Sequence, residues 1–314
     1  MTKTLILFST LALVTCGTYA GELHVFTSGK AGFNTHSVWY DDGQEVTVVD
    51  TQFTPAIAQS MLNEIKNKTK SPVTRLIVTH ANPDKFNALS VFNALGVETI
   101  ASRGTADAMV DADKYKRYYW VNVAKAFTDQ SYPKFETVKT TYTGKKVITL
   151  KSGETITLFE LSKPGVASNQ SVVRFDKTGD LAVGDLVASN NHAWLEGSIV
   201  NGKPTPAINS WIENLKMLPA LDHGKVYGGR GDFLPVKDAV RQEIAYLQTA
   251  DSIVGTYVRN LGARKNELDD PAKQGAHYAE IQSEFARAFP HYAMPELIGY
   301  SVYGLVNQKM NSAK

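Results

Sequence analysis

The sequence has almost no cysteine: Cys16 is the single one among 314 residues, and it lies close to the N-terminus. A disulfide framework, or thiol chemistry later in the chain, is therefore excluded. An excess of one charge is also missing, because 33 Lys and Arg offset 31 Asp and Glu and leave a net charge of +2. A chain this balanced has no global field to attract nucleic acid or a membrane surface.

Long apolar runs are absent after residue 20, so no membrane helix is expected there. The first twenty residues have the pattern of a secretory signal: Lys3, an apolar run over residues 5–14, and small residues before Gly21. We expect a periplasmic or secreted protein comprising residues 21–314. The alternative is a lipoprotein anchored at Cys16, although Thr15 is a poor residue to precede such a cysteine.

Hydrophobic residues make up 43% of the chain, enough for a large core, and their spacing predicts alternating strands and helices. We expect strands at 23–27, 37–40, 46–49, 75–79, 97–101, 146–150, 155–161, 171–175, 181–184 and 225–228. We expect helices at 55–66, 83–95, 207–218 and 236–261, mostly helical structure over 103–135, and a helical tail from 272 to 314. This alternation predicts α/β layers around sheets in one compact domain.

Five short motifs occur in order along the chain. They are a strand ending in Asp50, the loop His80-Ala81-Asn82-Pro83-Asp84-Lys85, the turn over 164–170, Gly184-Asp185, and Gly229-Arg230-Gly231. In order and spacing they resemble the metallo-β-lactamase superfamily. That resemblance implies an α/β, four-layer αββα sandwich with a helical C-terminal extension and a site at one edge of two sheets. Residues 191–197, with Trp211 downstream, have a weaker likeness to secreted members associated with quinoprotein and sulfur-oxidation systems.

The same resemblance assigns metal positions. The first zinc would use the positions of His80, Asn82 and Val166 with Asp185, and the second those of Asp84, Lys85, Asp185 and Arg230. Zinc needs neutral imidazole or anionic ligands. Valine cannot coordinate, an amide is a poor ligand, and two positions carry cations.

The charges at these positions sum to zero, because Lys85 and Arg230 stand opposite Asp84 and Asp185. Two convergent carboxylates without a metal would repel each other, and a buried carboxylate without a partner is costly. We therefore hypothesise that an internal salt-bridge network replaces the zinc centre and that the protein uses no cofactor.

Each residue also has a simpler interpretation. His80 could be a hydrogen-bonded histidine at a strand end, Asp84 a cap of the helix near Phe86, and Asp185 a turn residue. Alternatively, one zinc could bind at a rebuilt site of His80, Asp84 and Asp185, with His36 and His192 as pocket neighbours. The basic and aromatic run over 114–120 is interpreted as one face of an amphipathic helix, with a lid or ligand-stacking wall as the alternative.

These observations favour an exported, metal-independent or non-catalytic descendant of a hydrolase that binds a small ligand or a partner. The alternative is a working hydrolase of esters, lactones, β-lactams or phosphodiesters. It would use one metal, or no metal with Asp84, Lys85 and Asp185 as catalytic candidates. Lys85 could act as a base only with a depressed pKa, which neighbouring carboxylates oppose. A purely structural module has no positive support in the sequence.

Overall fold

The computed structural model describes residues 21–312. The predicted signal and Cys16 lie outside the described residues, so export stays a prediction. Among residues 21–312, no helix combines the length and hydropathy needed to cross a membrane.

Two six-stranded sheets form the centre of the molecule. The first sheet runs in the order β1 (Glu22–Thr27), β2 (His36–Asp41), β3 (Val46–Val49), β4 (Val73–Ile77), β5 (Glu98–Ser102) and β6 (Thr140–Tyr142). The second runs in the order β14 (Leu234–Pro235), β13 (Lys225–Gly228), β10 (Asp180–Gly184), β9 (Gln170–Phe175), β8 (Thr155–Leu161) and β7 (Lys145–Thr149). In the first sheet β1 to β3 are antiparallel and β3 to β6 are parallel, whereas the second is antiparallel except for the parallel β10–β13 pair.

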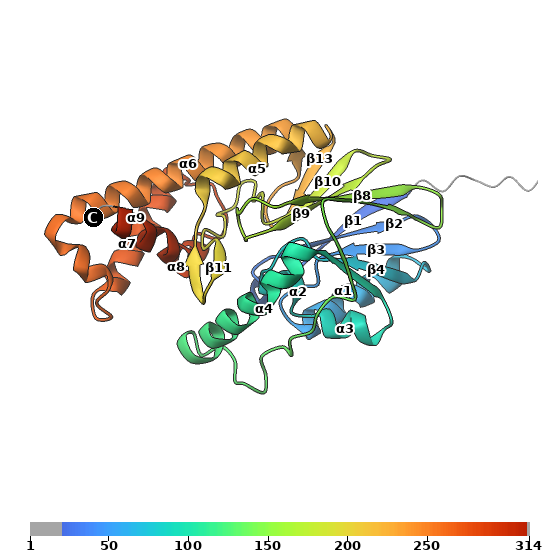
Figure 1. Ribbon diagram of the computed structural model, residues 1–314, viewed down its shortest axis with the longest axis horizontal. Coiled ribbons are helices and arrows are strands. Elements are labelled where there is room, and N and C mark those ends of the chain that lie inside the picture. The colour runs from blue at the N-terminus through green and yellow to red at the C-terminus, as the bar shows by residue number, and fades with distance from the viewer. Residues whose placement is uncertain (1–20, 313–314) are drawn as a thin grey trace, which may run out of the picture.

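The sheets pack face to face, and helices cover their outer faces (Figure 1). Ile77 and Ile100 of the first sheet share one apolar cluster with Ile156 and Val173 of the second. Outside the first sheet lie α1 (Pro55–Lys68) and α3 (Leu89–Ala94), and outside the second lie α5 (Ile208–Leu221) and α6 (Val236–Leu261). This arrangement confirms the predicted αββα sandwich.

The C-terminal region extends the sandwich as a group of shorter helices beside α6 (Figure 1). It comprises η3 (Gly262–Leu268), α7 (Gln274–Ala288), α8 (Glu296–Ser301) and α9 (Tyr303–Ser312). A hairpin of β11 (Ser198–Val200) and β12 (Lys203–Thr205) contacts α9 and α4 (Arg103–Tyr118). The helical tail was therefore predicted correctly in kind, but its division into separate helices was not.

Two predicted helices are wrong in extent. The segment 83–95 is broken into α2 (Pro83–Phe86) and α3, because the carbonyls of Asp84 and Lys85 accept the N–H groups of Gln52 and Thr51 instead of continuing the helix. The segment 103–135 forms α4 (Arg103–Tyr118) and a π-helical turn, η2 (Tyr119–Val123), and then runs without regular structure to β6.

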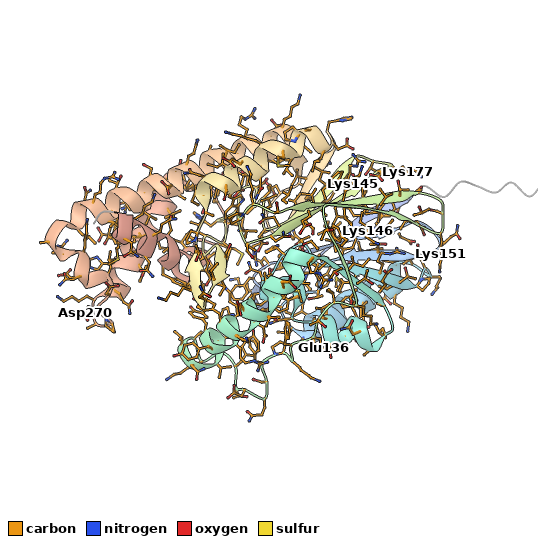
Figure 2. The ribbon with its side chains drawn as sticks, viewed as in Figure 1. Glu136, Lys145, Lys146, Lys151, Lys177 and Asp270 are labelled. Carbon is orange, nitrogen blue, oxygen red and sulfur yellow. The ribbon has the colours of Figure 1, made fainter. Side chains whose placement is uncertain are left out.

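Charged side chains are spread over the outer surface. Lys145, Lys146, Lys151 and Lys177 lie at the sheet end of the molecule, far from Asp270 among the C-terminal helices (Figure 2). Against this ordinary surface, a second set of charged groups is buried between the ends of the two sheets.

Candidate functional site

The predicted site residues come together where strands of both sheets end. His80 follows β4, Asp84 and Lys85 lie on the single turn of α2, Asp185 follows β10, and Arg230 follows β13. All five are buried, and His80 and Lys85 are completely inaccessible to solvent.

Four ion pairs join the charged groups into a closed ring. Lys85 Nζ lies 2.9 Å from Asp84 Oδ2 and 2.8 Å from Asp185 Oδ1. Arg230 contacts the same two carboxylates, with Nη2 2.8 Å from Asp84 Oδ2 and Nη1 2.8 Å from Asp185 Oδ2. Each cation therefore bridges both carboxylates, and each carboxylate has two cationic partners.

The contacts within this ring favour the charged form of all four groups. Burial alone would neutralise each group, but the opposite charges outweigh it. Lys85 and Arg230 thereby lower the pKa of Asp84 and hold that of Asp185 well below its usual range. The carboxylates in turn raise the pKa of Lys85 and of Arg230. The carboxylates thus favour the protonated form of Lys85, and its role as a base stays a prediction.

The loop between β1 and β2 fastens the ring from one side. The Thr35 hydroxyl donates to Asp84 Oδ2 and accepts from Arg230 Nη2, both at 2.8 Å. Arg230 Nε also donates to the Phe33 carbonyl at 3.0 Å. The contacts of Asp84 at 2.8–2.9 Å are all made by Oδ2, and Oδ1 makes none of them.

Glycine is required where the backbone passes the ring. A Cβ atom on Gly229 would lie 1.8 Å from Asp185 Oδ1 and 2.9 Å from Lys85 Nζ. Gly184 has a φ of +54°, and a Cβ there would lie 2.3 Å from Thr79 Oγ1. Gly184 and Gly229 thus allow a close approach of the backbone to buried polar groups.

Asp50 is buried near Lys85 and His80 and was predicted only as a strand end. Its carboxylate accepts from the Thr79 N–H at 2.8 Å and from the Thr79 hydroxyl. Burial raises its pKa to about 6, against the opposing charge of Lys85.

A small cavity of about 20 Å³ opens beside the ring and is lined by equal numbers of aromatic and polar side chains. Four polar residues, Asn82, Asp84, Lys116 and Arg230, line it together with Pro83 and the aromatic residues Phe33, Phe53, Trp120 and Trp194. The ring of Phe33 lies 5.5 Å from that of Phe53, 5.6 Å from Trp120 and 6.5 Å from Trp194, between ring centroids. Tyr300 of α8 adds a further ring 6.1 Å from Phe33.

A second buried ion pair holds one wall of this cavity. Lys116 of α4 pairs with Glu196 and lies over the Trp194 ring, 4.6 Å from its centroid. Glu196 also accepts a hydrogen bond from the Trp194 indole and one from Tyr303 of α9. The C-terminal helices therefore help to position the cavity wall.

The sequence profile of the metallo-beta-lactamase superfamily matches residues 31–230, which is more than half of the chain. The chain belongs to this superfamily. Its fold is similar to those of the metallo-β-lactamases TMB-1 and DIM-1, at 17% and 19% identity, each with a TM-score of 0.52 over 73% of this chain and 94% and 93% of theirs. A metallo-β-lactamase from Pontibacter korlensis is similar at 17% identity, with a TM-score of 0.53 over 74% of this chain and 97% of its own. These likenesses concern the fold.

The remaining positions at which the resemblance predicts zinc ligands have different surroundings. Val166 is fully buried in the apolar cluster of the second sheet, with Val172 and Leu186. Asn82 lies at the cavity and precedes α2, but its side chain makes no capping hydrogen bond. Asp84 is in the first turn of α2, and its carboxylate binds the ring instead of acting as the predicted cap of a helix near Phe86.

The histidines do not gather around one point. His80 Nδ1 lies 3.0 Å from Thr79 Oγ1, and its Nε2 lies 3.7 Å from Asp185 Oδ2. His36 contacts the Gly228 carbonyl, and burial lowers its pKa to about 4. His192 lies in an aromatic cluster with Tyr246 and the C-terminal helices, and its place beside the pocket stays a prediction.

Across residues 21–312, no group of three or more His, Cys, Asp or Glu side chains is arranged to hold a metal ion. The alternative one-zinc set of His80, Asp84 and Asp185 stays a prediction; its two carboxylates each contact both cations of the ring.

The sequence motifs identified the ring but missed most of the cavity. Lys116 and Trp120 of the basic and aromatic run are buried members of α4 and η2, and both line the cavity. Phe33 and Phe53 carried no recognisable signal. They follow β1 and β3, and only the folded sheets bring them together.

Proposed function

We propose that this protein uses its superfamily pocket without zinc, with the ion-pair ring in place of a dinuclear centre, and that the pocket binds a small molecule. The observation that carries the proposal is the closed set of four contacts at 2.8–2.9 Å between two carboxylates and two cations. Both carboxylates that would serve a metal are engaged, and a dication would have to enter beside Lys85 and Arg230.

The chemistry of the donor set supports the same conclusion. Zinc binds imidazole nitrogen, thiolate or carboxylate, usually four around each ion. Of the first-zinc positions, His80 offers a good nitrogen, Asn82 a weak oxygen and Val166 nothing. The second-zinc positions of Lys85 and Arg230 repel a dication instead of binding it. The residues present do not fit a zinc pair, and we derive no reaction step through one.

Binding is favoured over hydrolysis because the groups at the ring are already committed. A general base needs a lone pair within reach of the proton that it takes up. Lys85 is protonated and completely buried, and each carboxylate is held by two cations. A working hydrolase would have to break this ring during each turnover.

Metal analysis of protein purified without chelator tests the proposal. We expect much less than one zinc per chain, even after incubation with equimolar zinc and gel filtration. Retention of one or two zinc ions per chain would overturn it.

Restoring the superfamily ligands gives a positive control. A chain with Asn82→His, Lys85→His, Val166→His and Arg230→His keeps both carboxylates and removes both cations. We expect it to bind zinc and to show a melting temperature that rises with zinc concentration. Lys163→His, at an exposed lysine, controls for surface histidine. A folded restored chain that ignores zinc would show that the ring does not occupy the metal position.

A further inference from the structure

The cavity beside the ring is closed to anything larger than water. Its volume of about 20 Å³ is room for about one water molecule. Asn82, Asp84 and Arg230 line it, and each is no more than 6% exposed. A larger solute can therefore reach these groups only if one wall of the cavity moves. Which wall moves depends on how firmly each one is held.

Two of the aromatic walls are fastened to the ring itself. The Phe33 carbonyl accepts a hydrogen bond from Arg230 Nε at 3.0 Å. Phe53 directly follows Gln52, whose N–H donates to the Asp84 carbonyl at 2.9 Å. Displacing either wall would break a buried hydrogen bond and leave its polar groups without partners, which is costly.

Two further walls are fastened on the C-terminal side. The Trp194 indole donates to Glu196 at 3.0 Å, and both side chains are buried. Tyr300 lies on α8, where Ile298 is completely buried in the apolar cluster of the second sheet. Neither wall can move without breaking a buried polar contact or exposing core side chains to water.

Trp120 is the exception, because the segment that carries it has few ties to the sandwich. We call residues 119–131 the strap, which comprises η2 and an irregular stretch and follows α4 at the lower edge of the molecule (Figure 1). Within residues 21–312, no hydrogen bond joins the strap to either sheet. Its hydrogen-bond partners outside the strap all lie at residues 115–118 or at Tyr132.

Aromatic contacts hold the strap over the cavity. The Trp120 ring lies 5.6 Å from that of Phe33 and 5.4 Å from that of Phe53, between centroids. Phe127, farther along the strap, lies 5.6 Å from Phe53. Separating a few such pairs costs much less free energy than unfolding the sheets, so this segment can open while the sandwich stays folded.

We propose that the strap is a lid, which opens locally by withdrawing Trp120 and so admits solutes to the ion-pair ring. The indole leaves its place beside Phe33 and Phe53, and the cavity then joins the space that the indole occupied. π-helical turns are rare and frequently occur at functional sites, which supports η2 as the moving part. This inference rests on the proposed function, since a ring that serves a binding pocket must be reached from solvent.

A single engineered thiol in the cavity measures the opening. Asn82→Cys is introduced together with Cys16→Ser, so that it is the only thiol, and its reaction with iodoacetamide is followed with chelator present. Ser171→Cys, at a completely buried position of β9, is the matched control that reacts only when the sheets unfold. We expect position 82 to react at least about tenfold faster than position 171, at a rate that low urea concentrations hardly change.

Variants made with Asn82→Cys identify the wall that moves. Phe127 does not line the cavity, so Phe127→Ala loosens the strap without enlarging the cavity, and it should speed the labelling about tenfold. Tyr300→Ala, which weakens the α8 wall instead, should have a smaller effect. Tyr118→Ala, at a tyrosine of α4 that is 62% exposed, is the control and should change nothing. Circular dichroism and melting curves establish that each variant is folded.

Hydrogen exchange tests the same motion in the unmodified protein. The N–H groups of Ala124 and Ala126 donate to the Tyr119 and Trp120 carbonyls within the strap. If the strap opens locally, these amides exchange at least about tenfold faster than those of β9 and α8.

The outcomes separate the two proposals. The lid is overturned if position 82 reacts as slowly as position 171, or if strap amides are as well protected as those of β9. It is also overturned if labelling responds to Tyr300→Ala but not to Phe127→Ala. Each of these results leaves the metal-free ring intact. Zinc retained by the unmodified protein overturns the proposed function, whereas the labelling and exchange rates decide on the lid in either case.

Discussion

Removing one charge from the ring should be far more damaging than removing a compensated pair. Lys85→Met preserves most of the side-chain volume but leaves Asp84 and Asp185 facing each other with only Arg230 between them. We expect this single change to lower the free energy of unfolding by about 3–5 kcal/mol, the usual cost of leaving one buried charge without its partner.

The magnitude follows from the distances. At an effective dielectric constant of about 20, two unit charges 2.8 Å apart attract by roughly 6 kcal/mol, and Lys85 makes two such contacts. Desolvation of each buried ion offsets several kcal/mol of that attraction. The intact ring therefore adds little net stability, whereas a ring short of one charge retains the desolvation cost without the attraction.

A double variant isolates this effect. Lys85→Met combined with Asp185→Asn leaves Asp84 and Arg230 as a pair at 2.8 Å. Urea titrations monitored by circular dichroism should show the double variant to be more stable than Lys85→Met alone, with a coupling of about 2 kcal/mol between the sites. Arg241→Met, at an exposed pair with Asp238, is the control and should cost less than about 1 kcal/mol.

Either of two results would contradict the expected role of the ring. One is a Lys85→Met protein as stable as the unmodified chain. The other is a double variant whose loss equals the sum of the two single losses, because independent sites show no coupling.

Three further predictions concern the surroundings of the ring. Gly229→Ala should destabilise the protein by about 1–3 kcal/mol in urea titrations, because its Cβ would collide with Asp185; an unchanged midpoint would contradict the close approach. Burial raises the pKa of Glu243 from 4.5 to about 8. The free energy of unfolding should therefore fall as pH rises from about 4.5 to 8, by at most roughly 1.4 kcal/mol per pH unit. Glu243→Gln should flatten this slope between pH 5 and 8. Burial lowers the pKa of His192 from 6.5 to about 4. Its contribution to the free energy of unfolding is therefore complete above pH 6.5 and is lost as pH falls towards 4. His192→Gln should make the protein less sensitive to acid in that window, and an unaltered midpoint of acid unfolding would count against this expectation.

The layers of the fold were accessible to sequence reasoning because they depend on periodic apolar patterns. The strand at 46–49 and the helix at 236–261 have the bounds that their hydrophobic spacing predicts. The break between α2 and α3 was not accessible. It arises because Thr51 and Gln52, more than thirty residues upstream, donate to the carbonyls of that segment.

The candidate site, like the fold, could be predicted only in part. The ion pairs among the charged residues at the superfamily positions could be predicted from the sequence, since only four groups were involved and their charges summed to zero. The cavity depends on rings brought together from distant segments, such as Phe33 and Tyr300, and no local pattern links them. The pairing of Glu196 with Lys116 could not be predicted because the two residues are eighty positions apart in the sequence.

The C-terminal helices that help to form the cavity wall are the last part of the chain to be synthesised. A ribosome releases the chain from its N-terminus, and segments can begin to fold as they emerge. The strands of both sheets are complete by residue 235, but Tyr300 and Tyr303, which contact Phe33 and Glu196, are synthesised nearly seventy residues later. Each new molecule thus passes through an interval in which the sandwich can exist without a closed pocket, with Trp120 and Trp194 uncovered on the side that α8 will occupy.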